Sequence, residues 1–147
     1  MPLSSDLREF VELLNSRGVE YVIVGAHSLA FHGRPRYTGD LDILVRATPE
    51  NAAKIVDLLN EFGFADSDFK PSDFIEPEQM IQIGRPPNRI DLLTSITGVG
   101  SDEAFAGKIQ AELDGIPVAV LSKEALIRNK RAVGRTQDLA DIEALEQ

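Results

Sequence analysis

The stretch 25–42, GAHSLAFHGRPRYTGDLD, decides the fold and the chemistry of this 147-residue chain. A short apolar run, Tyr-Val-Ile-Val, ends at Gly25, and a short helical segment, an arginine-rich loop and an Asp-Leu-Asp motif follow. Glycine at a strand-to-helix junction lets the backbone approach a phosphate, and the helix N-terminus directs unpaired N–H groups at that anion. This layout is typical of a site that holds a nucleoside triphosphate with magnesium.

The Asp-Leu-Asp motif predicts a site for divalent cations. Asp40 and Asp42 stand two residues apart at the start of an expected strand over residues 41–45. Side chains two apart on a strand share a face, with Cα atoms roughly 6.5–7 Å apart, so two carboxylates can share a pair of metal ions. The alternative is a solvated strand end, which gives the same pattern.

A third carboxylate, Asp91, lies in a later apolar stretch, residues 89–93, that also reads as a strand. A carboxylate in the middle of a strand is costly to bury without a partner. Either a neighbouring metal ion or an arginine such as Arg89 would serve. The Asp-Leu-Asp motif favours the metal ion.

Three further polar residues are candidates for binding phosphate beside Gly25. Ser28 falls in the first turn of the short helix, where its hydroxyl can donate to a phosphate or simply cap the helix. Arg34 and Arg36 flank the following loop. A guanidinium group suits bidentate phosphate contacts, although loop arginines can equally be solvated.

The amino-acid composition limits which metal ions and partners the chain is expected to bind. The chain has no cysteine and only two histidines, His27 and His32, which are expected to pack against the fold, so a bound metal would be a hard ion such as Mg²⁺ or Mn²⁺ on carboxylates. The formal net charge of -9 opposes non-specific binding to nucleic acid. No apolar run approaches a membrane span and no signal peptide is expected, so the predicted compartment is the cytoplasm.

The pattern of apolar residues predicts one α/β domain over residues 1–147, with a mixed central sheet and helices packed on it. Its core is expected at about 19–121, and a C-terminal pair of helices at about 122–147. Hairpins are expected around 84–88 and at Asp114-Gly115. The expected strands are 21–24, 41–45, 80–83, 89–93, 109–113 and 116–121, and the expected helices are 4–16, 26–31, 48–62, 101–106, 122–133 and 136–145.

Together these residues resemble the nucleotidyltransferase superfamily, which has the fold of DNA polymerase beta. The resemblance rests on the turn with Gly25 and Ser28, on the Asp-Leu-Asp motif and on Asp91 in a later strand. The chain is also similar to small bacterial proteins grouped with the AbiEii toxins. They share the glycine turn, a His-Gly pair, a loop arginine and a C-terminal stretch like residues 135–141, RTQDLAD.

The resemblance implies magnesium-dependent transfer of a nucleotide from a nucleoside triphosphate to an RNA, protein or small-molecule acceptor, with a possible setting in a toxin–antitoxin or phage-defence pair. Asp40 and Asp42 would hold the metal ions. Asp91 would be the third ligand and would help to deprotonate the attacking hydroxyl. Lys130 would contact phosphate, and Asp138 lies in the terminal motif of the family.

The chain departs from the family at two places. Ala26 stands where the turn often carries a second glycine or a serine, and Gln137 stands where the terminal motif often carries lysine. Two other functions therefore stay open. One is a non-catalytic module that binds nucleotide or a partner protein, and the other is a metal-dependent phosphohydrolase.

Overall fold

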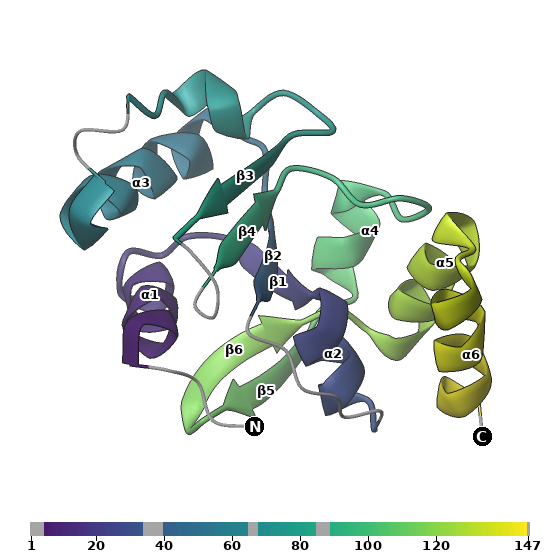
Figure 1. Ribbon diagram of the computed structural model, residues 1–147. Helices are drawn as coiled ribbons and strands as arrows, with labels where there is room; N and C mark the ends of the chain where they lie inside the picture. Colours follow the sequence, from purple (N-terminus) through teal and green to yellow (C-terminus); the bar gives the residue numbers. More distant parts are fainter. Residues whose placement is uncertain (1–4, 34–39, 65–67, 85–88, 147) are drawn as a thin grey trace.

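The computed structural model describes residues 5–33, 40–64, 68–84 and 89–146. Within these ranges six strands form one mixed sheet in the order β3-β4-β2-β1-β6-β5 (Figure 1). The mixed central sheet expected from the sequence is therefore confirmed. The strands are β1 (Tyr21–Val24), β2 (Leu41–Val45), β3 (Met80–Ile83), β4 (Ile90–Leu93), β5 (Ile109–Leu113) and β6 (Ile116–Val120).

The register of the three central strands brings the glycine turn, the Asp-Leu-Asp motif and Asp91 to one level of the sheet. Strand β1 runs antiparallel to β2 and parallel to β6, whereas β2 runs parallel to β4. Val24 lies opposite Asp42, and Asp42 lies opposite Asp91. The end of β1, the start of β2 and the start of β4 therefore meet at one edge.

Helices cover both faces of the sheet (Figure 1). Thr48 and Ser122 cap α3 and α5, because each hydroxyl accepts a hydrogen bond from the backbone N–H three residues ahead. No helix among the described residues is long and apolar enough to cross a membrane. The helices are α1 (Ser5–Ser16), α2 (Gly25–Phe31), α3 (Pro49–Leu59), α4 (Ser101–Ala106), α5 (Lys123–Val133) and α6 (Thr136–Leu145).

The sheet separates two apolar clusters. Alternate strand residues such as Ile23 and Ile43 pack with α1 and α3 on one face. Val24 and Leu44 point to the other face and pack with α2, α4 and α5. Since side chains alternate along a strand, Asp42 shares the face of Leu44 and lies on the side of α2.

Most expected elements are confirmed within one residue of their bounds. The Asp114-Gly115 hairpin is present, and both residues have positive φ, as a two-residue turn of this kind requires. The last helix is capped by Arg135, whose backbone is extended and whose N–H donates to the carboxylate of Asp138. The helix expected over 48–62 is shorter, because α3 ends at Leu59 and a π-helical segment, Asn60–Phe64, follows with a left-handed backbone at Gly63. A short 3₁₀-helix forms at Pro71–Phe74.

Candidate active site

The turn between β1 and α2 is built around Gly25. Its φ is +68°, a left-handed conformation that disfavours residues with a side chain. A Cβ atom at this position would overlap the carboxylate of Asp42 and would lie 2.9 Å from its Cγ. Glycine is therefore required here for two reasons, and the second ties the turn directly to the Asp-Leu-Asp motif.

The polar residues of α2, His27 and Ser28, are both buried within the protein. Ser28 is fully buried, and its hydroxyl donates to the carbonyl of Gly25 at 2.8 Å, which braces the turn. His27 is buried, and this burial lowers the pKa of its imidazole. The Nε2 atom of His32 lies 2.7 Å from the carbonyl of Leu121. Both histidines thus take part in packing, and Ser28 supports the turn in this structure.

Asp42 and Asp91 form a pair of interacting carboxyl groups on neighbouring parallel strands. Asp91 is buried, and a hydrogen bond joins its side chain to that of Asp42. Burial raises the pKa of Asp42 to about 7; the hydrogen bond to Asp91 and the negative charges of Asp91 and Asp40 add to the effect, and Arg89 opposes it. Two carboxyl groups so close must share a proton or a cation.

Arg89 supplies a positive charge to this cluster. Its Nε and Nη2 atoms lie 3.0 and 3.3 Å from the two carboxylate oxygens of Asp91, and Nη2 lies 2.9 Å from Oδ2 of Asp40. The arginine partner that the sequence offered as one alternative for Asp91 is therefore present. Asp40 itself precedes β2 and is more exposed than Asp91.

The donor set fits a hard divalent cation by its chemistry, since it consists of carboxylate oxygens with excess negative charge. Asp42 and Asp91 already share a hydrogen bond that a cation would replace. Within the part of the chain that the structure describes, however, no three acidic or histidine side chains are arranged to hold a metal ion as they stand. The guanidinium group of Arg89 lies against two of the three carboxylates.

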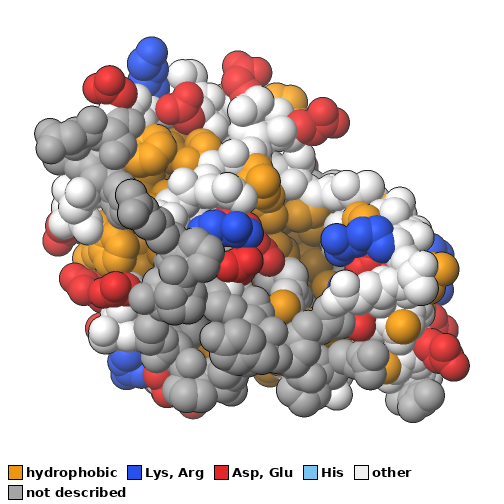
Figure 2. All heavy atoms as spheres, viewed as in Figure 1, with side chains coloured by type: hydrophobic (Ala, Val, Ile, Leu, Met, Phe, Trp, Pro, Cys, Tyr) orange, Lys and Arg blue, Asp and Glu red, His pale blue; other side chains and the backbone are white. Residues whose placement is uncertain are grey.

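A cleft of about 770 Å³ opens beside Gly25 and Asp42. It is lined by the segments 77–80 and 95–98, by Leu93 and by Asn129 of α5. Figure 2 shows hydrophobic side chains in a hollow of this face, with Lys or Arg side chains over acidic ones on both sides. The volume of the cleft lies within the range of small-molecule sites, roughly 300–1,000 Å³.

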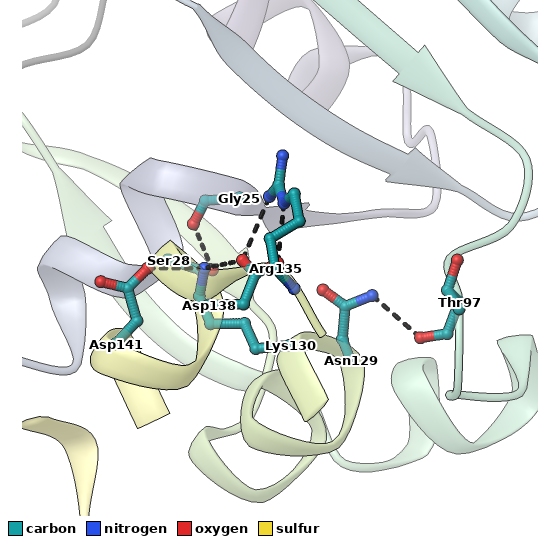
Figure 3. Close-up of polar contacts among 8 residues, drawn as sticks. All are labelled: Gly25, Ser28, Thr97, Asn129, Lys130, Arg135, Asp138 and Asp141. Atoms are coloured by element: carbon teal, nitrogen blue, oxygen red, sulfur yellow. Dashed lines mark hydrogen bonds and ion pairs between the residues drawn. The ribbon is translucent and has the colours of Figure 1, made fainter. Parts of the chain in front are cut away.

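Lys130 belongs to a second cluster of charges, at the C-terminal helix pair (Figure 3). Its amine lies 3.0 Å from Asp141 and 3.4 Å from Asp138, and both carboxylates are almost completely buried. Arg135 also binds Asp138, with contacts of 2.7 and 3.1 Å, and this pairing lowers the pKa of Asp138 to about 2. The amine of Lys130 is thus already paired in this structure.

Two predicted residues, Arg34 and Arg36, lie outside the described residues. Sequence reasoning missed Asn129, whose side-chain amide donates to the carbonyl of Thr97 at 2.9 Å and holds α5 against the cleft (Figure 3). No motif marks this asparagine. Its only signal is its place beside Lys130 in the helix.

Solved structures with a similar fold include proteins described as nucleotidyltransferases, nucleotidyltransferase-like proteins and an adenylyltransferase. One is a Thermotoga maritima protein assigned to the nucleotidyltransferases, with 20% identity, a TM-score of 0.62 and coverage of 94% of this chain and 88% of that one. The antibiotic-resistance factor ANT(2'')-Ia has 13% identity and a TM-score of 0.60, over 96% and 80% of the two chains. The lincomycin-bound lincosamide antibiotic adenylyltransferase LnuA has 13% identity and a TM-score of 0.57, over 100% and 99%.

No curated protein sequence matches the chain. The family model described as aminoglycoside-2''-adenylyltransferase matches residues 6–145, which is nearly the whole chain. This family and the shared fold confirm the expected enzyme class, a nucleotidyltransferase, whereas the similarity to AbiEii-type proteins is not confirmed. The chain belongs to the aminoglycoside-2''-adenylyltransferase family.

Proposed function

We propose that this enzyme transfers a nucleotide from a nucleoside triphosphate to a hydroxyl group of a small molecule, using Mg²⁺ or Mn²⁺ held by Asp40, Asp42 and Asp91. The observation that carries the proposal is the in-register pair of Asp42 and Asp91 directly behind the turn at Gly25. When bound, the metal would supply charge neutralisation for the triphosphate and activation of the acceptor hydroxyl.

The residues of the turn would position the phosphates. Gly25 keeps the backbone clear of a side chain at the mouth of the cleft, and Ser28 holds this backbone in place through its carbonyl. Contacts from Arg34 and Arg36 to phosphate stay predictions from the sequence. For Lys130 we propose a supporting part, in which its charge compensates two buried carboxylates and fixes the helix pair beside the cleft.

The acceptor class rests on the family. The family model and LnuA are named as adenylyltransferases of antibiotics, and ANT(2'')-Ia is named as an antibiotic-resistance factor. These names favour ATP as the donor and a small hydroxylated acceptor over tRNA or protein. Glu78 in the cleft wall and the formal net charge of -9 favour a cationic acceptor. A toxin–antitoxin partner stays a prediction from the motif resemblance alone.

A transfer assay tests the proposal. The four α-labelled nucleoside triphosphates would be incubated with Mg²⁺ and, separately, with an aminoglycoside, a lincosamide, total tRNA and cell protein. We expect label on a small molecule with the wild-type chain and with Asp57→Asn, an exposed control in α3, and none with Asp42→Asn. Label on tRNA or protein instead would overturn the acceptor class.

A non-catalytic binding module is the second candidate, and one observation favours it. Arg89 already neutralises part of the carboxylate cluster, so the folded protein does not depend on a metal ion there. Metal-dependent binding of nucleotide, without release of pyrophosphate in the presence of any acceptor, would establish this alternative. Release of free phosphate in place of pyrophosphate would indicate a phosphohydrolase.

A further inference from the structure

The position of Arg89 gives it a part in binding that the family resemblance does not assign. Arg89 precedes β4 directly, two residues before Asp91, so both side chains lie on one face of the strand. Its guanidinium group bridges Asp91 of β4 and Asp40, the residue directly before β2. It therefore lies against the same oxygens that a divalent cation would need.

The backbone of Arg89 is fixed, whereas its side chain is partly open to solvent. Its carbonyl accepts a hydrogen bond at 3.0 Å from the backbone N–H of Leu41, which joins β2 to β4. The side chain is 30% exposed, whereas that of Asp91 is only 6% exposed. The guanidinium group can thus leave the carboxylates without breaking the pairing of the two strands.

The charges around Arg89 favour two different positions of its side chain, one without a metal ion and one with it. With the site free of metal, Arg89 offsets the repulsion between Asp40 and Asp91. A guanidinium group and a divalent cation repel each other and compete for the same oxygens, so both cannot keep them. A guanidinium group also forms bidentate contacts with phosphate, and the phosphates of a metal-bound nucleotide would lie beside the carboxylates.

We propose that Arg89 is the exchangeable counter-ion of the carboxylate site. It neutralises Asp40 and Asp91 in the absence of metal, and it moves to the phosphates of the nucleotide when these carboxylates bind a divalent cation. Arg89 should therefore weaken the binding of metal alone and strengthen the binding of metal together with nucleotide. This inference rests on the metal-binding role proposed above for Asp40, Asp42 and Asp91.

The test compares Arg89→Gln with wild type by titration calorimetry, first with Mn²⁺ alone and then with a non-hydrolysable ATP analogue in saturating Mn²⁺. We expect Mn²⁺ alone to bind about tenfold more tightly to the variant and the analogue to bind about tenfold more weakly, in the usual range for coupling between ligands. Arg89→Lys, which keeps the charge but loses the bidentate contacts, should shift both affinities less.

Arg46→Gln is the matched control. Arg46 follows β2, its side chain is 28% exposed, and it pairs with Glu20 and Asp102 away from the carboxylate cluster. Both affinities should be unchanged in this variant. Circular dichroism would verify that each variant is folded.

Three outcomes would overturn the inference, and they can be told apart. If Arg89→Gln and Arg89→Lys weaken both binding steps, Arg89 only maintains the structure of the site. If neither step changes, the ion pairs have no part in binding. If wild type binds Mn²⁺ no better than Asp42→Asn does, the metal site of the proposed function fails, and the inference fails with it.

Discussion

Replacing Asp42 by asparagine should stabilise the protein at high pH while abolishing its proposed activity. The pKa of Asp42 is about 7 in the folded protein, against an ordinary value of 3.8. Between these two pH values the unfolded chain has lost the proton that the folded protein keeps. The unfolded state therefore binds fewer protons, so the free energy of unfolding must fall as the pH rises through this window.

The size of the effect follows from the shift. Each pKa unit corresponds to about 1.4 kcal/mol, and Arg89 and partial contact with solvent screen part of the interaction, so we expect a loss of about 2 kcal/mol by pH 8. Asparagine keeps the volume and a hydrogen bond to Asp91 but carries no charge. The variant should therefore melt roughly 5–10 °C above wild type at pH 8, and this difference should shrink steadily as the pH falls toward 5.

Thermal unfolding followed by circular dichroism from pH 5 to pH 8.5 measures this difference, with Asp57→Asn as the exposed control. Mg²⁺ at pH 8 should raise the melting temperature of wild type and leave Asp42→Asn unchanged, because only the wild-type cluster gains a ligand. If the melting temperatures of wild type and Asp42→Asn changed with pH in the same way over the whole range, the reasoning would be refuted. They would show that Asp42 is ionised at little cost.

Three other perturbations have expected outcomes. Gly25→Ala should cost about 1–2 kcal/mol from the left-handed backbone alone, and its overlap with Asp42 should also weaken nucleotide binding; urea unfolding and calorimetry measure the two effects. Lys130→Met should lower the free energy of unfolding by about 3 kcal/mol, because it leaves the buried carboxylates of Asp138 and Asp141 without the amine. A loss below about 1 kcal/mol, measured by urea unfolding, would contradict this expectation. Because the pKa of Asp138 is about 2, its contribution to the free energy of unfolding is full above about pH 4 and is lost as the pH falls toward 2. The free energy of unfolding of Asp138→Asn should therefore depend less on pH between about 4 and 2.

Local patterns were sufficient to predict the elements of the fold. Residues 21–24 form a strand because a continuous apolar run of this length is buried on both faces of a sheet, and residues 41–45 do so with Asp42 as the one polar exception. The turn at Asp114-Gly115 followed from residues that tolerate positive φ. The cap at Arg135 was not predictable in the same way, since its contact with Asp138 uses the backbone N–H, which every residue except proline carries.

The carboxylate cluster was predicted only in part, because its geometry depends on pairing between distant strands. The Asp-Leu-Asp motif and the mid-strand position of Asp91 indicated carboxylates that need a partner. Nothing local indicates that β2 and β4 are neighbours and parallel, which is what brings Asp42 opposite Asp91. The sequence left an arginine and a metal ion as rival partners for Asp91. Arg89 is the partner in this structure, and its partly exposed side chain is the basis for our proposal that the two partners alternate.

The two basic residues at the charged clusters differ in a way that the sequence does not reveal. Lys130 is 11% exposed and lies between two carboxylates that are each 1% exposed, so moving its amine away would leave buried charges unpaired. Arg89 is more exposed, and one of its partners, Asp40, is 37% exposed, so its guanidinium group can be replaced at much lower cost. Lys130, which resembles the phosphate-contacting lysine of the family, is thus held between buried carboxylates in this structure, whereas Arg89, directly before β4, is the cation that we propose to follow the nucleotide.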